Sequence, residues 1–325
     1  MTQLAYILAA SHSGSTLLSM LLVSHLQIAT VGEMKLSASA MGKIDRYRCS
    51  CGEFIRQCRF WTKVKEGMAR RGYDFDISNA RTDYREVDSG YARWLLGPLH
   101  RGMLLESLRD GALGISLTWR KKLLEIHRRN AALASTVSEI TKAEVVVDSS
   151  KIALRLKYLL RNPKLDVKVI RLIRDGRGVA LTYMDPAGFA DAADPALRGG
   201  GSGGLRENER LSMAGAAYEW RRSNEEAEHI LCRLDKSQWI EVRYEDLCRD
   251  TENTLVRLFE FLGVNPDKRS RDFRTVEHHV VGNGMRLDTA SQISLDERWK
   301  SILTSQELET FDRIGGKLNT RYGYS

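Results

Sequence analysis

The stretch "AYILAASHSGSTLLSMLL", residues 5–22, constrains the fold more than any other part of the chain. It overlaps an apolar run at residues 4–10, and this run predicts a buried β-strand. Small polar residues follow, and residues 14–25 then carry leucines at helical spacing. A buried strand that passes through a short polar loop into an apolar helix is the repeating unit of a parallel α/β sheet.

The same alternation continues along the chain. Further buried strands are predicted at residues 28–31, 144–148, 167–173 and 239–243. Helical patterns are predicted at residues 118–142, 152–161, 208–233 and 253–262. We therefore expect an α/β fold, a P-loop-like parallel β-sheet flanked by helices, in a single domain over residues 1–325. Its ligands should bind beyond the carboxyl ends of the strands.

Two segments do not follow this alternation. Residues 46–113 fit no simple βα pattern and are predicted to form a helical insertion. Residues 185–206 are rich in glycine and are predicted to form a flexible loop. Such a loop would act either as a lid over a ligand or as a passive connector.

The charge balance favours an anionic ligand, because 50 basic residues stand against 42 acidic ones, a net charge of +8. No run of four basic residues occurs, which argues against a nucleic-acid partner. The N-terminus lacks a basic region and no segment reaches about 18 apolar residues, so no signal peptide or transmembrane segment is predicted. The five cysteines, an odd number, argue against a secreted disulfide scaffold, and we expect a cytoplasmic protein.

The first loop has the composition of an anion site. Backbone amides at the start of a helix are unpaired donors at the positive end of its dipole. Gly14 allows a close approach of the backbone, and Ser13, Ser15 and Thr16 add hydroxyl donors. The alternative is an ordinary turn with serine caps. A Walker A loop is excluded because no lysine follows Gly14 and the earlier glycine is missing.

Three further segments occur in a recognisable order after this loop. They are "VIRLIRDGRGVALTYM" (residues 169–184), "WIEVRYEDLCRDTENTLVRLFEFLGV" (residues 239–264), and "VVGNGMRLD" with "DERWK" (within residues 280–300). Together with the first loop, they resemble the bacterial-type sulfotransferases that use 3′-phosphoadenosine-5′-phosphosulfate (PAPS). The resemblance covers the chain from residue 4 to about residue 300, apart from the predicted insertion.

The resemblance implies how PAPS would be held. The first loop, His12 to Thr16, would hold the 5′-phosphosulfate. Arg174 and Thr182 stand where the family has an arginine and, eight residues on, a serine for the 3′-phosphate. Tyr244 resembles the tyrosine near the adenine, and Arg286 resembles a 3′-phosphate contact in a C-terminal segment, residues 265–325, that covers the cofactor.

Arg174 also has a physical case of its own. It follows an apolar strand at the carboxyl edge of the sheet, and a guanidinium can hold a phosphate with two parallel hydrogen bonds. The alternative, a surface Arg-Asp turn, remains the better interpretation of Arg177.

Sulfuryl transfer needs a base for the acceptor hydroxyl and positive charge at the oxygen that leaves with the nucleotide. No metal is required. We expect Glu33 to be the base, with a pKa raised by repulsion from the sulfuryl group. Its position is similar to that of the catalytic glutamate in tyrosylprotein and several carbohydrate sulfotransferases, not to that of the histidine in drug-type enzymes. The alternative is a solvated glutamate at a helix start.

Lys151 is the candidate for neutralising the leaving oxygen, with Ser149 or Ser150 as hydroxyl donors. The family often has an Asp-Lys-Ser segment here, and the lysine of this chain is shifted in register. A capped helix start with a solvated lysine is the alternative. The resemblance implies an acceptor hydroxyl on a carbohydrate, a lipid or another small molecule.

His12 departs from the family, whose loop has lysine or arginine at this position. Three explanations are open: Lys151 carries more of the electrostatic work, activity rises below about pH 7, or His12 packs structurally in a slow enzyme. Two other functions stay as alternatives: a P-loop kinase-like phosphotransferase with a degenerate loop, and an inactive nucleotide-binding module.

The cysteines at positions 49, 51 and 58 could bind zinc with His25 or His100, or form a disulfide. Their spacings differ from the usual two-residue ones, and buried free thiols are a third interpretation. We do not expect His278 and His279 to act as a catalytic pair.

Overall fold

The computed structural model describes residues 1–36, 44, 47–85, 90–96, 103–192, 194, 197, 210–270, 272–276, 279–288 and 291–324. A five-stranded sheet lies at its centre, in the order β2-β3-β1-β4-β5, and every pairing is parallel. The strands are β1 (Thr2–Ala9), β2 (Ile28–Thr30), β3 (Val145–Lys151), β4 (Leu165–Ile173) and β5 (Trp239–Arg243). The predicted α/β fold with a parallel sheet is confirmed.

The central strand β1 is buried on both faces. Leu4, Tyr6 and Leu8 enter one hydrophobic cluster, whereas Ala5 and Ile7 enter another on the opposite face. This division explains why the strand reads as a continuous apolar run and not as an alternating one.

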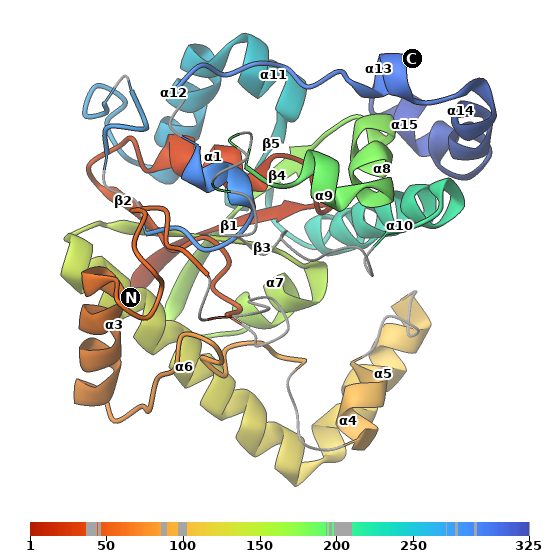
Figure 1. The fold of residues 1–325 in the computed structure, drawn as a ribbon. Coiled ribbons are helices and arrows are strands. Elements are labelled where there is room, and N and C mark those ends of the chain that lie inside the picture. Colours follow the sequence, from red (N-terminus) through yellow and green to blue (C-terminus); the bar gives the residue numbers. More distant parts are fainter. Residues whose placement is uncertain are drawn as a thin grey trace.

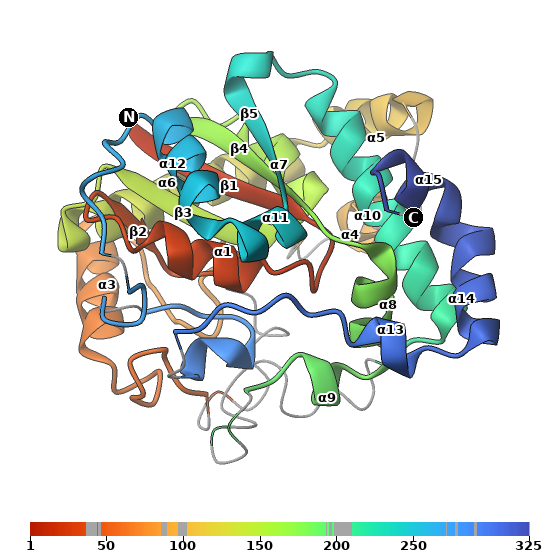
Figure 2. The same cartoon turned by 90° about the horizontal axis from the view of Figure 1, so that it is seen from above.

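Helices cover both faces of the sheet (Figures 1 and 2). One face carries α1 (Ser15–Leu22), α11 (Tyr244–Arg249) and α12 (Thr251–Leu262). The other carries α3 (Arg59–Arg70), α6 (Leu117–Thr141) and α7 (Ala153–Leu159). A third cluster joins α8 (Gly176–Met184), α10 (Met213–Leu231), α14 (Ser305–Phe311) and α15 (Lys317–Arg321).

The segments expected to break the alternation have mixed outcomes. Residues 46–113 contain α3, α4 (Gly90–Leu95) and most of α5 (Met103–Ile115), and α3 packs on α6 within the main core. The glycine-rich loop begins with α9 (Pro186–Phe189), but most of it lies outside the described residues. The predicted domain limits remain predictions.

One element differs from its prediction in a way that matters for the site. Strand β3 does not end at residue 148 but continues to Lys151, and α7 begins only at Ala153. Lys151 is therefore the last residue of a strand, where its side chain lies at the carboxyl edge of the sheet, and not the first turn of a helix.

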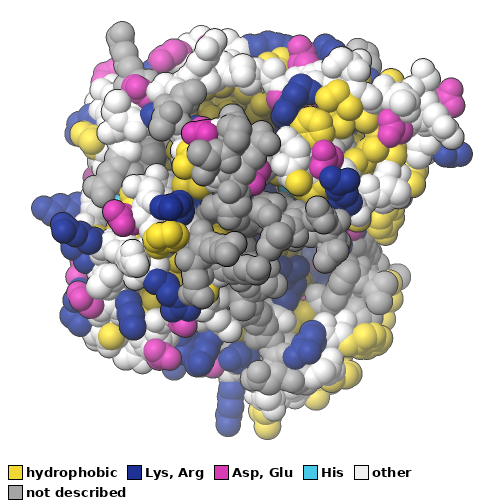
Figure 3. All heavy atoms as spheres, in the orientation of Figure 1, with side chains coloured by type: hydrophobic (Ala, Val, Ile, Leu, Met, Phe, Trp, Pro, Cys, Tyr) yellow, Lys and Arg dark blue, Asp and Glu magenta, His cyan; other side chains and the backbone are white. Residues whose placement is uncertain are grey.

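The surface shows mixed charge on the face drawn in Figure 3. Lysine and arginine side chains are scattered there among acidic and uncharged ones, and the described residues of this face form no continuous basic stripe. Within the described part of the chain, no helix is long and apolar enough to cross a membrane.

Candidate active site

The first loop turns sharply between β1 and α1. Gly14 precedes the first residue of α1 with a φ of 90°, in the left-handed region that favours glycine. A Cβ on Gly14 would lie 2.6 Å from Cδ2 of Tyr244, so the ring leaves room for glycine alone. Among the described residues, no side chain caps the amides at the start of α1. The loop thus presents helix-start donors beside an aromatic ring.

The hydroxyl of Ser13 is the most informative atom of this loop. Ser13 is 1% exposed, and its Oγ has no hydrogen-bond partner among the residues that the structure describes. A buried hydroxyl without a partner costs about 1–3 kcal/mol, and such groups are rare in folded proteins. An anionic ligand on the loop would supply the missing partner, so the residues present fit a phosphate-like group.

Arg174 lies beside this loop, as predicted. Its Nη1 donates a hydrogen bond to the carbonyl oxygen of His12 at 2.9 Å, and its Nη2 contacts the Asp296 carboxylate at 2.9 Å. The indole Nε1–H of Trp220 donates to the carbonyl oxygen of Arg174 at 3.2 Å. Strand β4 pairs directly with β1, and this pairing brings the arginine to the loop.

The ring of Tyr244 contacts both Arg174 and the first loop at Gly14. The guanidinium carbon of Arg174 lies 4.4 Å from the centroid of the Tyr244 ring, and the same ring packs on Gly14. Burial raises the pKa of Tyr244, which stays a neutral phenol. The cation–π contact holds the guanidinium of Arg174 over the ring.

Two further predicted nucleotide contacts, Thr182 and Arg286, also have protein partners. The Thr182 hydroxyl donates to the carbonyl oxygen of Gly178 at 3.1 Å within α8. Arg286 is 1% exposed and donates to the carbonyl oxygens of Gly282, Asn283 and Arg48. The contacts show that Arg286 holds the C-terminal segment against residues near Arg48, whereas phosphate binding by either residue stays a prediction.

Glu33 and Lys151 meet at the carboxyl ends of β2 and β3. The Lys151 Nζ lies 2.5 Å from Oε1 of Glu33, and the Lys35 Nζ lies 3.2 Å from Oε2. Burial alone would raise the pKa of Glu33, but the two lysines outweigh it and lower the pKa to about 2. The sequence indicated neither Lys151 nor Lys35 as a partner of Glu33; the expected rise depends on a sulfuryl group near the carboxylate and stays a prediction.

A buried ion pair between Asp148 and Arg155 supports the loop that carries Glu33, residues 32–35. Arg155 Nε contacts Oδ2 of Asp148 at 2.9 Å, with both side chains almost fully buried. Asp148 Oδ1 accepts hydrogen bonds from the amide of Met34 and from the hydroxyl of Ser150. Ser150 is thus occupied in holding this loop, since its Oγ also accepts from the amide of Lys35. The sequence showed Asp148 only as a strand residue.

The backbone is unusual at two of the three predicted catalytic positions, His12 and Lys151. His12 has a φ of 64° and Lys151 a φ of 69°, a region that residues with a side chain rarely adopt. Such conformations cluster at functional sites, where packing enforces them. Gly32 has a φ of 79°, and a Cβ there would meet the carbonyl oxygen of Val281. The turn that carries Glu33 therefore requires glycine.

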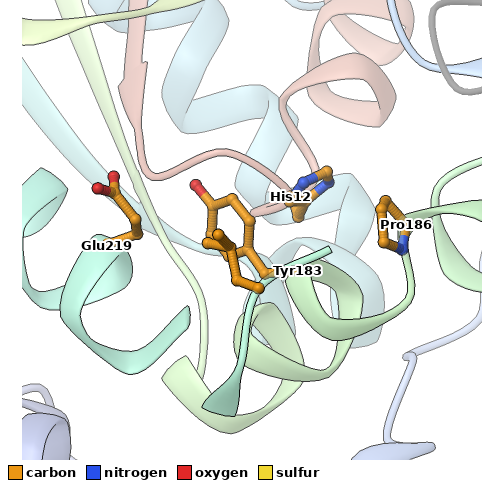
Figure 4. Close-up of a pocket in the computed structure, with 5 residues that line it drawn as sticks. His12, Tyr183, Pro186 and Glu219 are labelled. Carbon is orange, nitrogen blue, oxygen red and sulfur yellow. The ribbon is translucent and has the colours of Figure 1, made fainter. Parts of the chain in front are cut away.

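A cavity lies beside His12 (Figure 4). It encloses about 320 Å³ and is lined by His12, Tyr183, Pro186, Leu211 and Glu219. The imidazole meets the Tyr183 ring edge-on, with centroids 4.7 Å apart. Apart from His12, the lining residues come from elements that follow β4, whereas Glu33 follows β2 on the other side of β1. Sequence reasoning missed Tyr183, although it stands next to Thr182 in the quoted motif.

Known proteins resemble the chain over different parts of its length. Human carbohydrate sulfotransferase 2 is 26% identical over 190 residues, 49% of this chain and 35% of that protein. Human carbohydrate sulfotransferase 3 is 25% identical over 172 residues, 52% of this chain and 36% of that protein. The chain thus spans about a third of the length of these curated relatives.

Solved sulfotransferase structures are also similar. The sulfotransferase domain from the curacin biosynthetic pathway has a TM-score of 0.48 and 18% identity, and the match covers 100% of this chain and 99% of that one. The model of the sulfotransferase family matches residues 5–268, which include the first loop, Glu33, Lys151, Arg174 and Tyr244. This match extends over most of the chain. The chain belongs to the sulfotransferase family.

Proposed function

We propose that the enzyme transfers a sulfuryl group from PAPS to a hydroxyl group of a carbohydrate, a lipid or another small molecule. The curated relatives are named as carbohydrate sulfotransferases, which favours sugars as the first acceptors to test. They are matched over about a third of their length, so the acceptor is proposed by analogy.

The observation that carries the proposal is the buried hydroxyl of Ser13, which has no hydrogen-bond partner in the described part of the chain and lies on a loop that Arg174 contacts directly. Ser13, Gly14, Ser15 and Thr16 would hold the phosphosulfate end through amide and hydroxyl donors. Arg174 would hold the ribose phosphate, with Tyr244 near the adenine. Thr182 and Arg286 are proposed as further contacts to the nucleotide.

Glu33 would accept the proton of the acceptor hydroxyl. The bound donor supplies the electrophilic sulfur, and no metal is proposed for the transfer. With a pKa of about 2, Glu33 is ionised at neutral pH and can accept a proton, but it is a weak base while it is paired with Lys151 and Lys35. We propose that Lys151 leaves Glu33 and pairs with the anionic donor when the donor binds. Glu33 then loses its closest positive charge, and its pKa rises toward the working pH.

Lys151 would stabilise the negative charge on the leaving oxygen, with the imidazole of His12 as a weaker donor beside the loop. The left-handed backbone conformation of His12 and Lys151 sets the direction in which their side chains leave the main chain. Lys35 holds the other oxygen of Glu33 and keeps the carboxylate in place when Lys151 leaves.

Incubation with PAPS and a panel of sugars, lipids and phenols, followed by mass spectrometry, tests the proposal. We expect one acceptor class to gain the mass of SO₃, and 3′,5′-adenosine bisphosphate to raise the thermal unfolding temperature more than Mg-ATP does. Stabilisation by Mg-ATP alone would point to a phosphotransferase. Bisphosphate binding without any sulfonated product would point to an inactive binding module.

A further inference from the structure

Three cysteines and a histidine converge on one point away from the proposed donor residues. The ligand atoms of Cys49, Cys51, Cys58 and His279 all lie within 4.8 Å of one another. We propose that these four residues bind a structural zinc ion, Zn²⁺. The expected fourth ligands were wrong or unplaced, since His25 Nε2 contacts the carbonyl oxygen of Asn265 and His100 lies outside the described residues.

The separations match those of a tetrahedral zinc site. Zn–S bonds of about 2.3 Å and a Zn–N bond of about 2.0 Å, in a tetrahedron, place sulfurs about 3.8 Å apart and sulfur and nitrogen about 3.5 Å apart. The Sγ atoms of Cys51 and Cys58 are 3.7 Å apart. His279 Nδ1 lies 3.5 Å from Sγ of Cys49 and 3.4 Å from Sγ of Cys58. These three separations have the spacing that a zinc ion imposes, and the other three lie within 4.8 Å.

The chemistry of these four ligands favours zinc over other metals and over a disulfide. Three thiolates and one imidazole are ligands that zinc prefers, whereas magnesium and calcium prefer oxygen. All five cysteines lie in the described part of the chain, and each is free. A disulfide between Cys51 and Cys58 would need a bond of about 2.05 Å and would leave Cys49 and His279 facing it. Four protein ligands also close the site, as in structural zinc centres.

The local backbone holds the sulfurs in position. Arg48 and Phe54 form an antiparallel bridge, and Gly52 turns between them with a φ of 90°. This turn carries Cys49 and Cys51, and the amide of Cys58 donates to the carbonyl oxygen of Phe54 at 3.0 Å. The site is thus arranged by hydrogen bonds of its own backbone.

The histidine side is equally well packed. The imidazole of His279 stacks on the ring of Phe60, with centroids 4.3 Å apart and planes 5° apart. Phe60 belongs to α3, so the helix that follows Cys58 also orients the fourth ligand. This orientation turns Nδ1 toward the sulfurs.

The zinc ion would fasten the C-terminal segment to the sheet. Immediately after His279, the amide of Val280 donates to the Ser50 hydroxyl at 2.8 Å, and Val281 forms a parallel bridge with Gly32. The next residue, Glu33, donates its amide to the carbonyl oxygen of Val281. The metal therefore supports the turn that carries the proposed base, without contacting it.

Metal analysis of the full chain tests this proposal. The protein is expressed in medium with added zinc, purified with a phosphine reductant and without chelator, and measured by plasma mass spectrometry. We expect about one zinc per chain, and cobalt substitution should give the visible absorption bands of a tetrahedral thiolate site. Cys51→Ser and His279→Ala should weaken zinc binding by more than about 100-fold. Cys51 is exposed, so its substitution disturbs the core least.

Cys232→Ser is the matched control, because that thiol is exposed and far along the chain; it should keep its zinc. Circular dichroism and bisphosphate binding show that each variant is folded. Iron or copper in place of zinc overturns the proposal, as does reduced wild-type protein with no more zinc than Cys51→Ser. A Cys51–Cys58 disulfide that survives the reductant, seen as a loss of two hydrogen masses, overturns it too.

Discussion

Arg174 donates a hydrogen bond to the carbonyl oxygen of His12 at 2.9 Å, and so joins the two predicted halves of the donor site. The β1–β4 pairing that creates this contact places the end of one strand beside the end of the other. The loop expected to hold the sulfuryl end and the arginine expected to hold the ribose phosphate are therefore one connected structure.

Arg174→Ala should weaken binding of 3′,5′-adenosine bisphosphate by about 10- to 100-fold, because charged hydrogen bonds to phosphate are lost. Isothermal calorimetry measures the affinity. Arg177→Ala is the control, since Arg177 is paired with Asp175 and lies over the ring of Trp299. Equal losses in both variants, or no loss in Arg174→Ala, would remove Arg174 from the donor site.

Ser13→Ala should separate stability from affinity. Removing a buried hydroxyl that has no partner among the described residues should leave the free energy of unfolding unchanged or raise it by about 1 kcal/mol. The affinity for the bisphosphate should fall by about 3- to 10-fold, the value of one hydrogen bond. Urea unfolding and calorimetry measure the two quantities.

Ser19→Ala is the matched control for that experiment. The Ser19 hydroxyl donates to the carbonyl oxygen of Thr16 at 2.9 Å, so its loss should lower stability by about 1 kcal/mol and leave affinity unchanged. If Ser13→Ala behaves as Ser19→Ala does, the Ser13 hydroxyl serves the fold and not a ligand.

The strands could be predicted from the sequence because burial on both faces leaves a local signature. The apolar run at β1 needed no knowledge of the rest of the chain, whereas β5, predicted as a buried strand, lies at the edge of the sheet and buries only Val242. The carboxyl-edge placement of Arg174 followed from the same pattern. The end of β3 could not be predicted, since the polar residues 148–151 continue the strand through tertiary contacts: Lys151 pairs with Leu8 of β1, and the Ser149 amide donates to the carbonyl oxygen of Gly32.

The partners of the site residues were harder to predict than their positions. Lys35 and Lys151 both reach Glu33 and lower its pKa, and the sequence indicated neither contact. His279 joins cysteines more than 200 residues earlier in the chain, and no spacing rule links them. Such pairings are set by the packing of distant segments, here the bridge between Gly32 and Val281.

Lys151→Ala should lower kcat by at least about 100-fold, because the charge that stabilises the leaving oxygen is lost. Lys35→Ala is the control: it contacts the same carboxylate but is not proposed to reach the donor, so kcat should fall by less than about 10-fold. Steady-state kinetics with saturating PAPS measures both. A larger loss in Lys35→Ala than in Lys151→Ala would show that Lys35, and not Lys151, stabilises the leaving oxygen.

His12→Arg should retain transfer, because arginine restores the charge that the family loop carries and Lys151 remains in place. We expect kcat within about 10-fold of wild type, measured over a range of pH. The imidazole packs edge-on against Tyr183, so His12→Phe keeps that contact without a charge and serves as the comparison. Loss of transfer in His12→Arg with retention in His12→Phe would show a packing role.

The ion pairs of Glu33 also predict how stability depends on pH. The pKa of this carboxyl is about 2 in the folded chain against an ordinary value of 4.5, so the unfolded chain binds more protons between those values. Its contribution is fully present above about pH 4.5 and is lost as the pH falls toward 2. Low pH therefore removes this contribution, whereas alkaline pH below the pKa of lysine leaves it intact.

Glu33→Gln should therefore lower the free energy of unfolding at pH 7 by about 1–3 kcal/mol, since Lys151 and Lys35 lose their shared partner. Urea unfolding at several pH values should show this difference shrinking below pH 4.5, because Glu33 of the unfolded wild-type chain takes up a proton there. Glu260→Gln, at an exposed position of α12, is the control, with a small difference at every pH. A deficit for Glu33→Gln that stays constant down to pH 3 would mean that the pair does not lower this pKa.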